Sequence, residues 1–192
     1  MKTNKSFLLL ASLCILLFSC SKNPVPKPYG YYRIDLPEHR YERFSGYPEF
    51  SFDLSVYADI EPVIDTVEGE WFNINYPAFN AQIYGSYFPM KPAQLNAFLE
   101  DNHKFVYRQH VMKADAIVGQ TFDNPEKKVY GTLYLIEGNV ASPLQFILTD
   151  STSHFFRASL LFDAVPNRDS ITPVLNYIKE DVVRLIESFT FQ

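Results

Sequence analysis

An apolar stripe near the C-terminus constrains the fold more than any other feature of the chain. Its members recur three or four residues apart, which is the period of an α-helix: Ile171, Val174, Leu175, Ile178, Val182, Leu185, Ile186 and Phe189. The stripe predicts a long helix that is capped by Ser170, carries Pro173 in its first turn and is closed by Phe189. Because this apolar face must be buried against another element, the rest of the chain has to supply a matching surface.

Alternating apolar and polar residues predict that this surface is a β-sheet. The alternation is clearest at residues 50–54 and 70–76. Further strands are expected at 82–88, 114–122, 129–136, 144–149 and 155–162, and a second helix is expected at 93–110. Apolar residues on both sides of 129–136 place that strand centrally. We therefore expect an α+β fold in which helices cover an antiparallel β-sheet, similar to the Mog1/PsbP-like α/β/α sandwich.

The first twenty residues have the order of a secretory signal peptide. Lys2 and Lys5 give a basic start, and an apolar run of about 12 residues follows at 7–18. This run is too short to span a bilayer, which takes about 20 apolar residues. It ends in LFSC, which resembles a bacterial lipobox. The resemblance implies cleavage after Ser19 and attachment of a fatty acid such as palmitate to Cys20, so that the bilayer is the first expected partner.

Three parts are expected along the chain. Residues 1–19 form the leader, residues 20–28 form a lipidated, proline-rich tether, and residues 29–192 form a single globular α+β domain. Proline at every second position from Pro24 to Pro28 favours an extended polyproline II spacer. The residues directly after Cys20 include no acidic cluster, which favours a periplasm-facing anchor in the outer membrane, with the inner membrane as the alternative.

The charge balance argues against nucleic acid as a partner. The chain has 17 Lys and Arg against 22 Asp and Glu, and the leader removes two lysines and no acid, which leaves 15 against 22, or −7. A chain with this balance gains little from a phosphate backbone. It is also repelled by an anionic bilayer surface, so the lipid has to provide the attachment.

Cysteine chemistry is not expected in the mature protein. Cys14 lies within the leader and Cys20 would be acylated, so no free thiol and no disulfide would remain. A cysteine nucleophile, a thiolate metal site and a redox pair are therefore excluded.

An aromatic and charged stretch opens the mature domain. Residues 29–41 read YGYYRIDLPEHRY, and the alternation at 31–36 predicts a short strand or an extended segment. The charged residues at 38–43 fit a solvated edge with weak ion pairs, but Tyr and Arg are also the residues that anchor interfaces. The candidate docking residues are Tyr29, Tyr31, Tyr32, Arg33, Asp35, His39, Arg40 and Tyr41.

This stretch resembles the N-terminal signature of the gliding motility lipoprotein GldD family of Bacteroidetes. WFNINYP at 71–77, QFILTDS at 145–151 and the segment from Ser170 to Phe189 follow the family in outline. The resemblance covers the mature chain from about Tyr29 onward. It implies a role in gliding motility and in the associated type IX protein secretion machinery, with other envelope proteins as partners, and it implies no catalytic residues.

No constellation for catalysis, metal or cofactor binding stands out. Asp150, Ser151, Ser153 and His154 are close in sequence, but neighbours on a tight turn do not converge as a hydrolase triad must, and a hydrogen-bonded hairpin turn explains them better. The acidic residues at 58–70 lack the spacing of a calcium loop. His103 and His110 lie seven apart, whereas a zinc pair is usually four apart. We therefore expect no enzyme activity, no metal and no cofactor.

The sequence leaves two main functional hypotheses, beside a third in which a hydrolase site is assembled from distant residues such as Asp150, His154 and a hydroxyl. The first is a non-enzymatic lipoprotein that supports gliding motility, type IX secretion or both through protein contacts. The alternative is a lipoprotein that binds peptidoglycan or another glycan through exposed tyrosines or Trp71.

Overall fold

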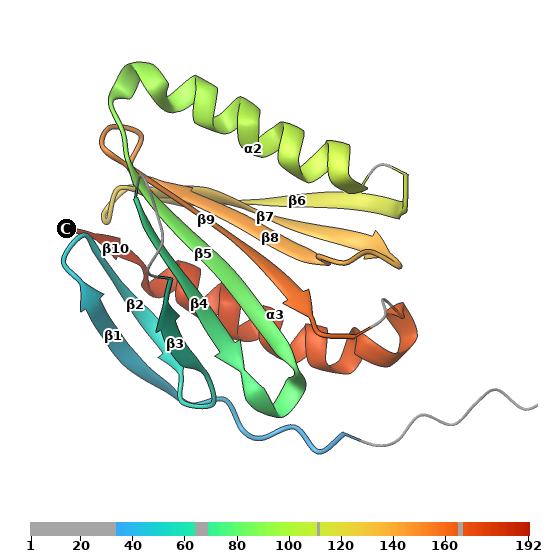
Figure 1. The fold of residues 1–192 in the computed structure, drawn as a ribbon. Coiled ribbons are helices and arrows are strands. Elements are labelled where there is room, and N and C mark those ends of the chain that lie inside the picture. The colour runs from blue at the N-terminus through green and yellow to red at the C-terminus, as the bar shows by residue number, and fades with distance from the viewer. Residues whose placement is uncertain (1–33, 64–68, 111, 165–166) are drawn as a thin grey trace, which may run out of the picture. The chain divides into compact units, whose positions relative to one another are not determined.

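Two antiparallel sheets and two α-helices form the folded unit Ile34–Gln192 (Figure 1). The structure is a computed structural model that describes residues 34–63, 69–110, 112–164 and 167–192. Its strands are β1 (Tyr41–Tyr47), β2 (Phe50–Ser55), β3 (Asp59–Pro62), β4 (Glu70–Tyr76), β5 (Ala81–Pro89), β6 (Ala114–Asn124), β7 (Val129–Gly138), β8 (Leu144–Thr149), β9 (His154–Phe162) and β10 (Thr190–Phe191). The helices are α2 (Leu95–His110) and α3 (Arg168–Ser188), with short 3-10 turns η1 (Pro77–Phe79) and η2 (Pro92–Gln94). The predicted leader and tether lie outside the described residues.

The larger sheet has seven strands in the order β3-β4-β5-β9-β8-β7-β6, and every neighbouring pair is antiparallel. The smaller sheet has the order β1-β2-β10. These observations confirm the expected α+β class and the antiparallel sheet. The predicted central position of 129–136 is wrong, because β7 lies second from the edge. Its two faces are both covered, since Leu133 belongs to the main core and Ile136 packs with Val106 of α2.

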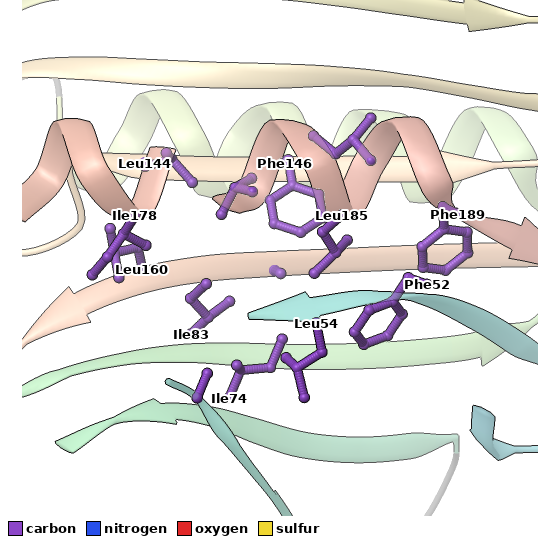
Figure 2. Close-up of a cluster of buried hydrophobic side chains, with 14 of the residues drawn as sticks. Phe52, Leu54, Ile74, Ile83, Leu144, Phe146, Leu160, Ile178, Leu185 and Phe189 are labelled. Atoms are coloured by element: carbon purple, nitrogen blue, oxygen red, sulfur yellow. The ribbon is translucent and has the colours of Figure 1, made fainter. Parts of the chain in front are cut away.

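One face of the larger sheet packs against α3 and the smaller sheet (Figure 1). Side chains from β2, β4, β5, β8, β9 and α3 converge in this core (Figure 2). The labelled members are Phe52, Leu54, Ile74, Ile83, Leu144, Phe146, Leu160, Ile178, Leu185 and Phe189, and each is at most 5% exposed. The Phe189 ring stacks on Phe52, with ring centroids 5.8 Å apart. The apolar stripe predicted for the C-terminal helix therefore does face a sheet.

The opposite face of the sheet is covered only in part, by α2 (Figure 1). Phe98 of α2 packs on Phe155 of β9 with ring centroids 4.9 Å apart, and Val106 is buried against Ile136 of β7. The same face of β4 and β5 carries Trp71 and Tyr84, which are 40% and 48% exposed. This half-covered face is where a partner can reach the sheet.

Some element boundaries differ from those predicted. Helix α3 begins at Arg168 with Asn167 as its N-cap, and the Asn167 Oδ1 atom accepts from the Ser170 backbone N–H. Ser170 is therefore inside the helix, and Pro173 lies beyond the first turn. For the segment 31–36, where a short strand or an extended segment was expected, the described residues 34–36 contain no strand, which leaves the extended alternative.

Candidate functional site

The residues predicted for docking are only partly within the described chain. Tyr29, Tyr31, Tyr32, Arg33 and the predicted lipidation site Cys20 lie outside it. The described members are Asp35, His39, Arg40 and Tyr41, which precede or begin β1. The structure brings His39 and Tyr41 together on helix α3, whereas Asp35 is exposed and Arg40 faces Tyr57.

A buried carboxylate on α3 holds the start of the folded unit. The Asp181 side chain is 2% exposed. Its Oδ1 atom lies 2.6 Å from Nδ1 of His39 and accepts from the Tyr41 hydroxyl at 3.0 Å, while Oδ2 accepts from the Tyr76 hydroxyl at 3.2 Å. The His39 ring stacks on Tyr177 at 4.2 Å. We call these five residues the Asp181 latch. A buried carboxylate with three donors meets the usual requirement for burying a charge.

The tyrosines of the Asp181 latch keep their protons over a wide pH range. Burial, followed by the negative charge of Asp181, raises the pKa of Tyr177 to about 12. The same two causes, together with a hydrogen bond to Asp181, raise the pKa values of Tyr41 and Tyr76 well above their ordinary value. The Tyr41 and Tyr76 hydroxyls therefore act as hydrogen-bond donors at neutral pH.

The two ring nitrogens of His39 each face a carboxylate. Nδ1 faces the buried carboxylate of Asp181, and Nε2 lies 3.0 Å from Oε2 of Glu180, whose side chain is exposed. Only a doubly protonated ring can donate to both acceptors. Through these two carboxylates, His39 connects the N-terminal stretch to α3. Arg40 points outward, where its Nη2 atom donates to the Tyr57 hydroxyl at 2.8 Å.

A hollow lies on the uncovered part of the larger sheet. We call it the sheet hollow. Its volume is about 580 Å³, which is within the range of about 300–1,000 Å³ that is usual for ligand pockets. It is lined mainly by β4, β5, β9 and α2, through Val63, Trp71, Asn73, Tyr84, Gly85, Ser86, Phe105, Arg157, Ser159 and Leu161. The strand register explains the grouping, because Trp71 pairs with Ser86 and Ser86 pairs with Arg157.

Arg157 is the cation of the sheet hollow. Its guanidinium carbon lies 5.4 Å from the centre of the Phe88 ring and 5.7 Å from that of Phe105. Its Nε atom donates to the Ser86 hydroxyl at 3.2 Å. Burial lowers the pKa of Arg157, and the charge of Asp101 partly offsets this effect. The rings of Phe88 and Phe105 and the Ser86 hydroxyl therefore fix the orientation of a partly desolvated guanidinium.

A second depression continues from the sheet hollow. Its volume is about 490 Å³, and it shares Tyr84 and Leu161 with the first. Polar side chains from the ends of β4 and β5, Asn75 and Gln82, line it together with Asn80. Together the two depressions offer a ligand more length than the sheet hollow alone.

The hairpin between β8 and β9 is organised by Asp150. Its carboxylate accepts from the backbone N–H groups of Thr152, Ser153 and His154. Burial alone would raise the pKa of Asp150, but these bonds and that of the Thr152 hydroxyl lower it well below its ordinary value. The His154 ring instead lies 2.7 Å from the Tyr87 hydroxyl. The hydrogen-bonded turn predicted for 150–154 is confirmed.

Metal and membrane-spanning features were searched over the described residues. Within that part of the chain, no group of three or more His, Cys, Asp or Glu side chains is arranged to hold a metal ion. Over the same ranges, no helix is long and apolar enough to cross a bilayer.

Comparison with known proteins identifies the family. A family model described as "Gliding motility lipoprotein GldD" matches residues 21–191. The chain belongs to the gliding motility lipoprotein GldD family. No curated protein matches it significantly. Membership of this lipoprotein family assigns the protein a lipid anchor and a place at the cell envelope, while Cys20 as the acceptor stays a prediction.

Little in the sequence pointed to the Asp181 latch or to the sheet hollow of this GldD-family domain. Asp181 falls outside the apolar stripe of its helix, and nothing local marks it as the acceptor for residues about 140 positions earlier. Arg157 was not singled out, because a lone arginine in a strand is not distinctive. A usable signal was present, since Arg157 is the one Lys, Arg, Asp or Glu residue in a mostly apolar strand.

Proposed function

We propose that this GldD-family protein is a non-enzymatic lipoprotein that supports gliding motility, type IX protein secretion or both by contacting other envelope proteins. Cys20 carries the fatty acid, and the domain faces the periplasm from the outer membrane, with the inner membrane as the alternative. The observation that carries the proposal is the family match over residues 21–191, which includes the described domain except its last residue, Gln192.

The surface of the domain supports a contact role. The sheet hollow exposes Trp71 and Tyr84, and exposed aromatic residues beside an arginine are typical of interface anchors. The groups most suggestive of chemistry are already engaged in structure. The Asp150 carboxylate organises its own turn, and the His39 imidazole is held between Asp181 and Glu180.

A complementation experiment tests the proposal. Deletion of the gene in the source organism should impair colony spreading, secretion of proteins to the cell surface, or both. A wild-type copy should restore the phenotype, whereas Cys20→Ala should not, and it should also lose incorporation of labelled palmitate. Normal spreading and normal secretion in the deletion strain would contradict the proposal.

Glycan binding is a second candidate, favoured by the position of two exposed rings. Trp71 and Tyr84 line one hollow on neighbouring strands, and flat aromatic faces of this kind stack on sugar rings. Purified sacculi should then retain the wild-type protein and release Trp71→Ala. A Tyr31→Ala, Tyr32→Ala variant tests the N-terminal stretch in the same assay, and Tyr107→Ala on α2 is the control for an exposed tyrosine away from the sheet hollow.

A further inference from the structure

We propose that the sheet hollow binds a segment of a partner protein in which a carboxylate stands next to a large apolar side chain. The inference rests on the proposed function, because it specifies the chemistry of the partner with which the domain makes contact. Two features of the sheet hollow carry it, an apolar floor open to solvent and one oriented positive charge.

The apolar floor accounts for the large side chain. Trp71 and Tyr84 are exposed, although the other face of the strands on which they stand contributes Phe72, Ile74 and Ile83 to the main core. Phe105 of α2 closes one side, and Leu161 of β9 adds an aliphatic surface. Burial of such rings by a partner removes their apolar area from water, which is a main source of affinity at protein interfaces.

Arg157 accounts for the carboxylate. A guanidinium has five N–H donors. Of these, only the Nε–H of Arg157 donates to an acceptor within the described part of the chain, the Ser86 hydroxyl. No carboxylate of the described chain lies within 4.0 Å of it. Asp101 is the carboxylate that acts on it electrostatically, but its side chain is 74% exposed and lies 3.6 Å from Nζ of Lys104. The cation is thus partly desolvated and poorly compensated, which favours an anion from a partner.

The side chains around Arg157 favour a planar anion. The guanidinium is flanked by the rings of Phe88 and Phe105, so that its remaining N–H groups are available at its edge. A planar fork pairs best with a planar carboxylate through two parallel hydrogen bonds. The adjoining depression, with Asn75 and Gln82, gives polar contacts for the backbone of a segment that continues beyond the carboxylate.

Other ligand classes fit less well. An acyl chain needs an enclosed cavity, whereas the side chains of Trp71 and Tyr84 are open to water. A neutral glycan uses many hydrogen-bonding groups, while the polar lining of the sheet hollow, apart from Arg157 and the polar tips of Trp71 and Tyr84, is limited to Asn73, Ser86 and Ser159. A neutral glycan would also leave the charge of Arg157 uncompensated.

A selection experiment tests the inference. The full chain, reconstituted in lipid vesicles, is used to select from a phage-displayed library of random peptides, with empty vesicles for subtraction. Enriched peptides should share an Asp or Glu beside an aromatic or aliphatic residue. One enriched peptide is then synthesised together with its Asp→Asn or Glu→Gln counterpart. Loss of the carboxylate should weaken binding to the wild-type protein about tenfold.

Matched variants assign the binding to the sheet hollow. Arg157→Gln should weaken binding of the acidic peptide about tenfold and remove most of the difference between it and its amide counterpart. Trp71→Ala, at an exposed position, should weaken binding of both peptides. Arg108→Gln removes the same charge from an exposed position of α2 outside the hollow and should change nothing. If Arg157→Gln disturbs folding, Arg157→Lys keeps the charge without the fork and should still weaken binding.

Each outcome supports or overturns the inference. Enriched peptides without a shared acidic residue, or acidic peptides that bind Arg157→Gln and wild type equally, overturn it. If no peptide is enriched but purified sacculi retain the wild-type protein and release Trp71→Ala, the inference is overturned in favour of a glycan. These failures leave the proposed function intact if deletion of the gene still blocks spreading or secretion. A deletion strain with no phenotype overturns the proposed function whatever the peptides show.

Discussion

Nδ1 of His39 lies 2.6 Å from Oδ1 of Asp181, although 142 residues separate the two positions in the chain. This contact and that of Tyr41 attach the start of the folded unit to helix α3, and Tyr76 attaches the end of β4 to the same carboxylate. The Asp181 latch therefore joins parts of the domain that no local sequence pattern connects.

Removal of the latch carboxylate should destabilise the domain strongly. In Asp181→Ala, three buried or partly buried donors lose their acceptor, and we expect the free energy of unfolding to fall by about 3 kcal/mol. Glu180→Ala is the matched control, because Glu180 contacts the same histidine with a side chain that is 70% exposed. It should cost less than about 1 kcal/mol. Urea denaturation measures both, and equal losses would show that the burial of Asp181 is unimportant.

Alkaline pH should weaken the fold through the raised tyrosine pKa values. Below pH 10 both folded and unfolded chains keep the proton of Tyr177, so its contribution is fully present. Between pH 10 and about 12 the unfolded chain loses this proton while the folded chain retains it, so the free energy of unfolding falls as pH rises. Tyr177→Phe should show a shallower fall over this range, as measured by denaturant unfolding at a series of pH values. An unchanged slope would exclude Tyr177 as a source of the sensitivity.

Two glycines on neighbouring strands should respond in opposite ways to alanine. A Cβ atom at Gly131 of β7 would lie 2.2 Å from the backbone O of Ile147 on β8, so Gly131→Ala forces the strands apart. We expect a loss of about 2 kcal/mol or more, at the scale of an overpacked core. At Gly119 of β6 the nearest atom would be 3.5 Å away, so Gly119→Ala should be neutral or slightly stabilising. Thermal unfolding distinguishes them, and similar midpoints would contradict the close approach of β7 and β8.

A charge in the seam between α3 and the sheet should also be costly. Val182 is 1% exposed within the main core, and Val182→Asp would bury a carboxylate without a partner there. The expected loss is several kcal/mol, enough to unfold much of the protein. Asn176→Asp introduces the same side chain at an exposed position of the same helix and should be tolerated. Circular dichroism and solubility of the two variants provide the comparison, and a folded Val182→Asp would place the seam elsewhere.

The elements that the sequence predicted well are those whose pattern is local and complete. The alternation at 70–76 corresponds to β4 (Glu70–Tyr76), and the stripe of the C-terminal helix faces the main core. In both, each side chain has one clear environment, apolar inside or polar outside. Period alone is then sufficient to give the element and its buried face.

The elements that were missed depend on partners far away in the chain. Strand β1 (Tyr41–Tyr47) was interpreted as a charged edge, but the Arg43 guanidinium donates to Ser51 and to Thr190, across the smaller sheet. Strand β3 (Asp59–Pro62) is short, exposed and acidic, and its pairing with β4 defines it. Asp181 lies outside the apolar stripe of its helix, and a carboxylate is seldom buried, so nothing in the sequence indicates its burial. The tyrosine donors that make this burial possible lie in the distant strands β1 and β4.

The same long-range donors decide how the domain withstands tension. With the anchor at the proposed Cys20, a pull reaches the described domain from its N-terminal side, where the His39 and Tyr41 side chains contact α3. Part of that load passes to Asp181 on α3, whose buried carboxylate also accepts from Tyr76 of β4, so that it is shared between the last helix and the larger sheet. An anchor that feeds force into the interior suits a protein whose attachment point is subject to drag.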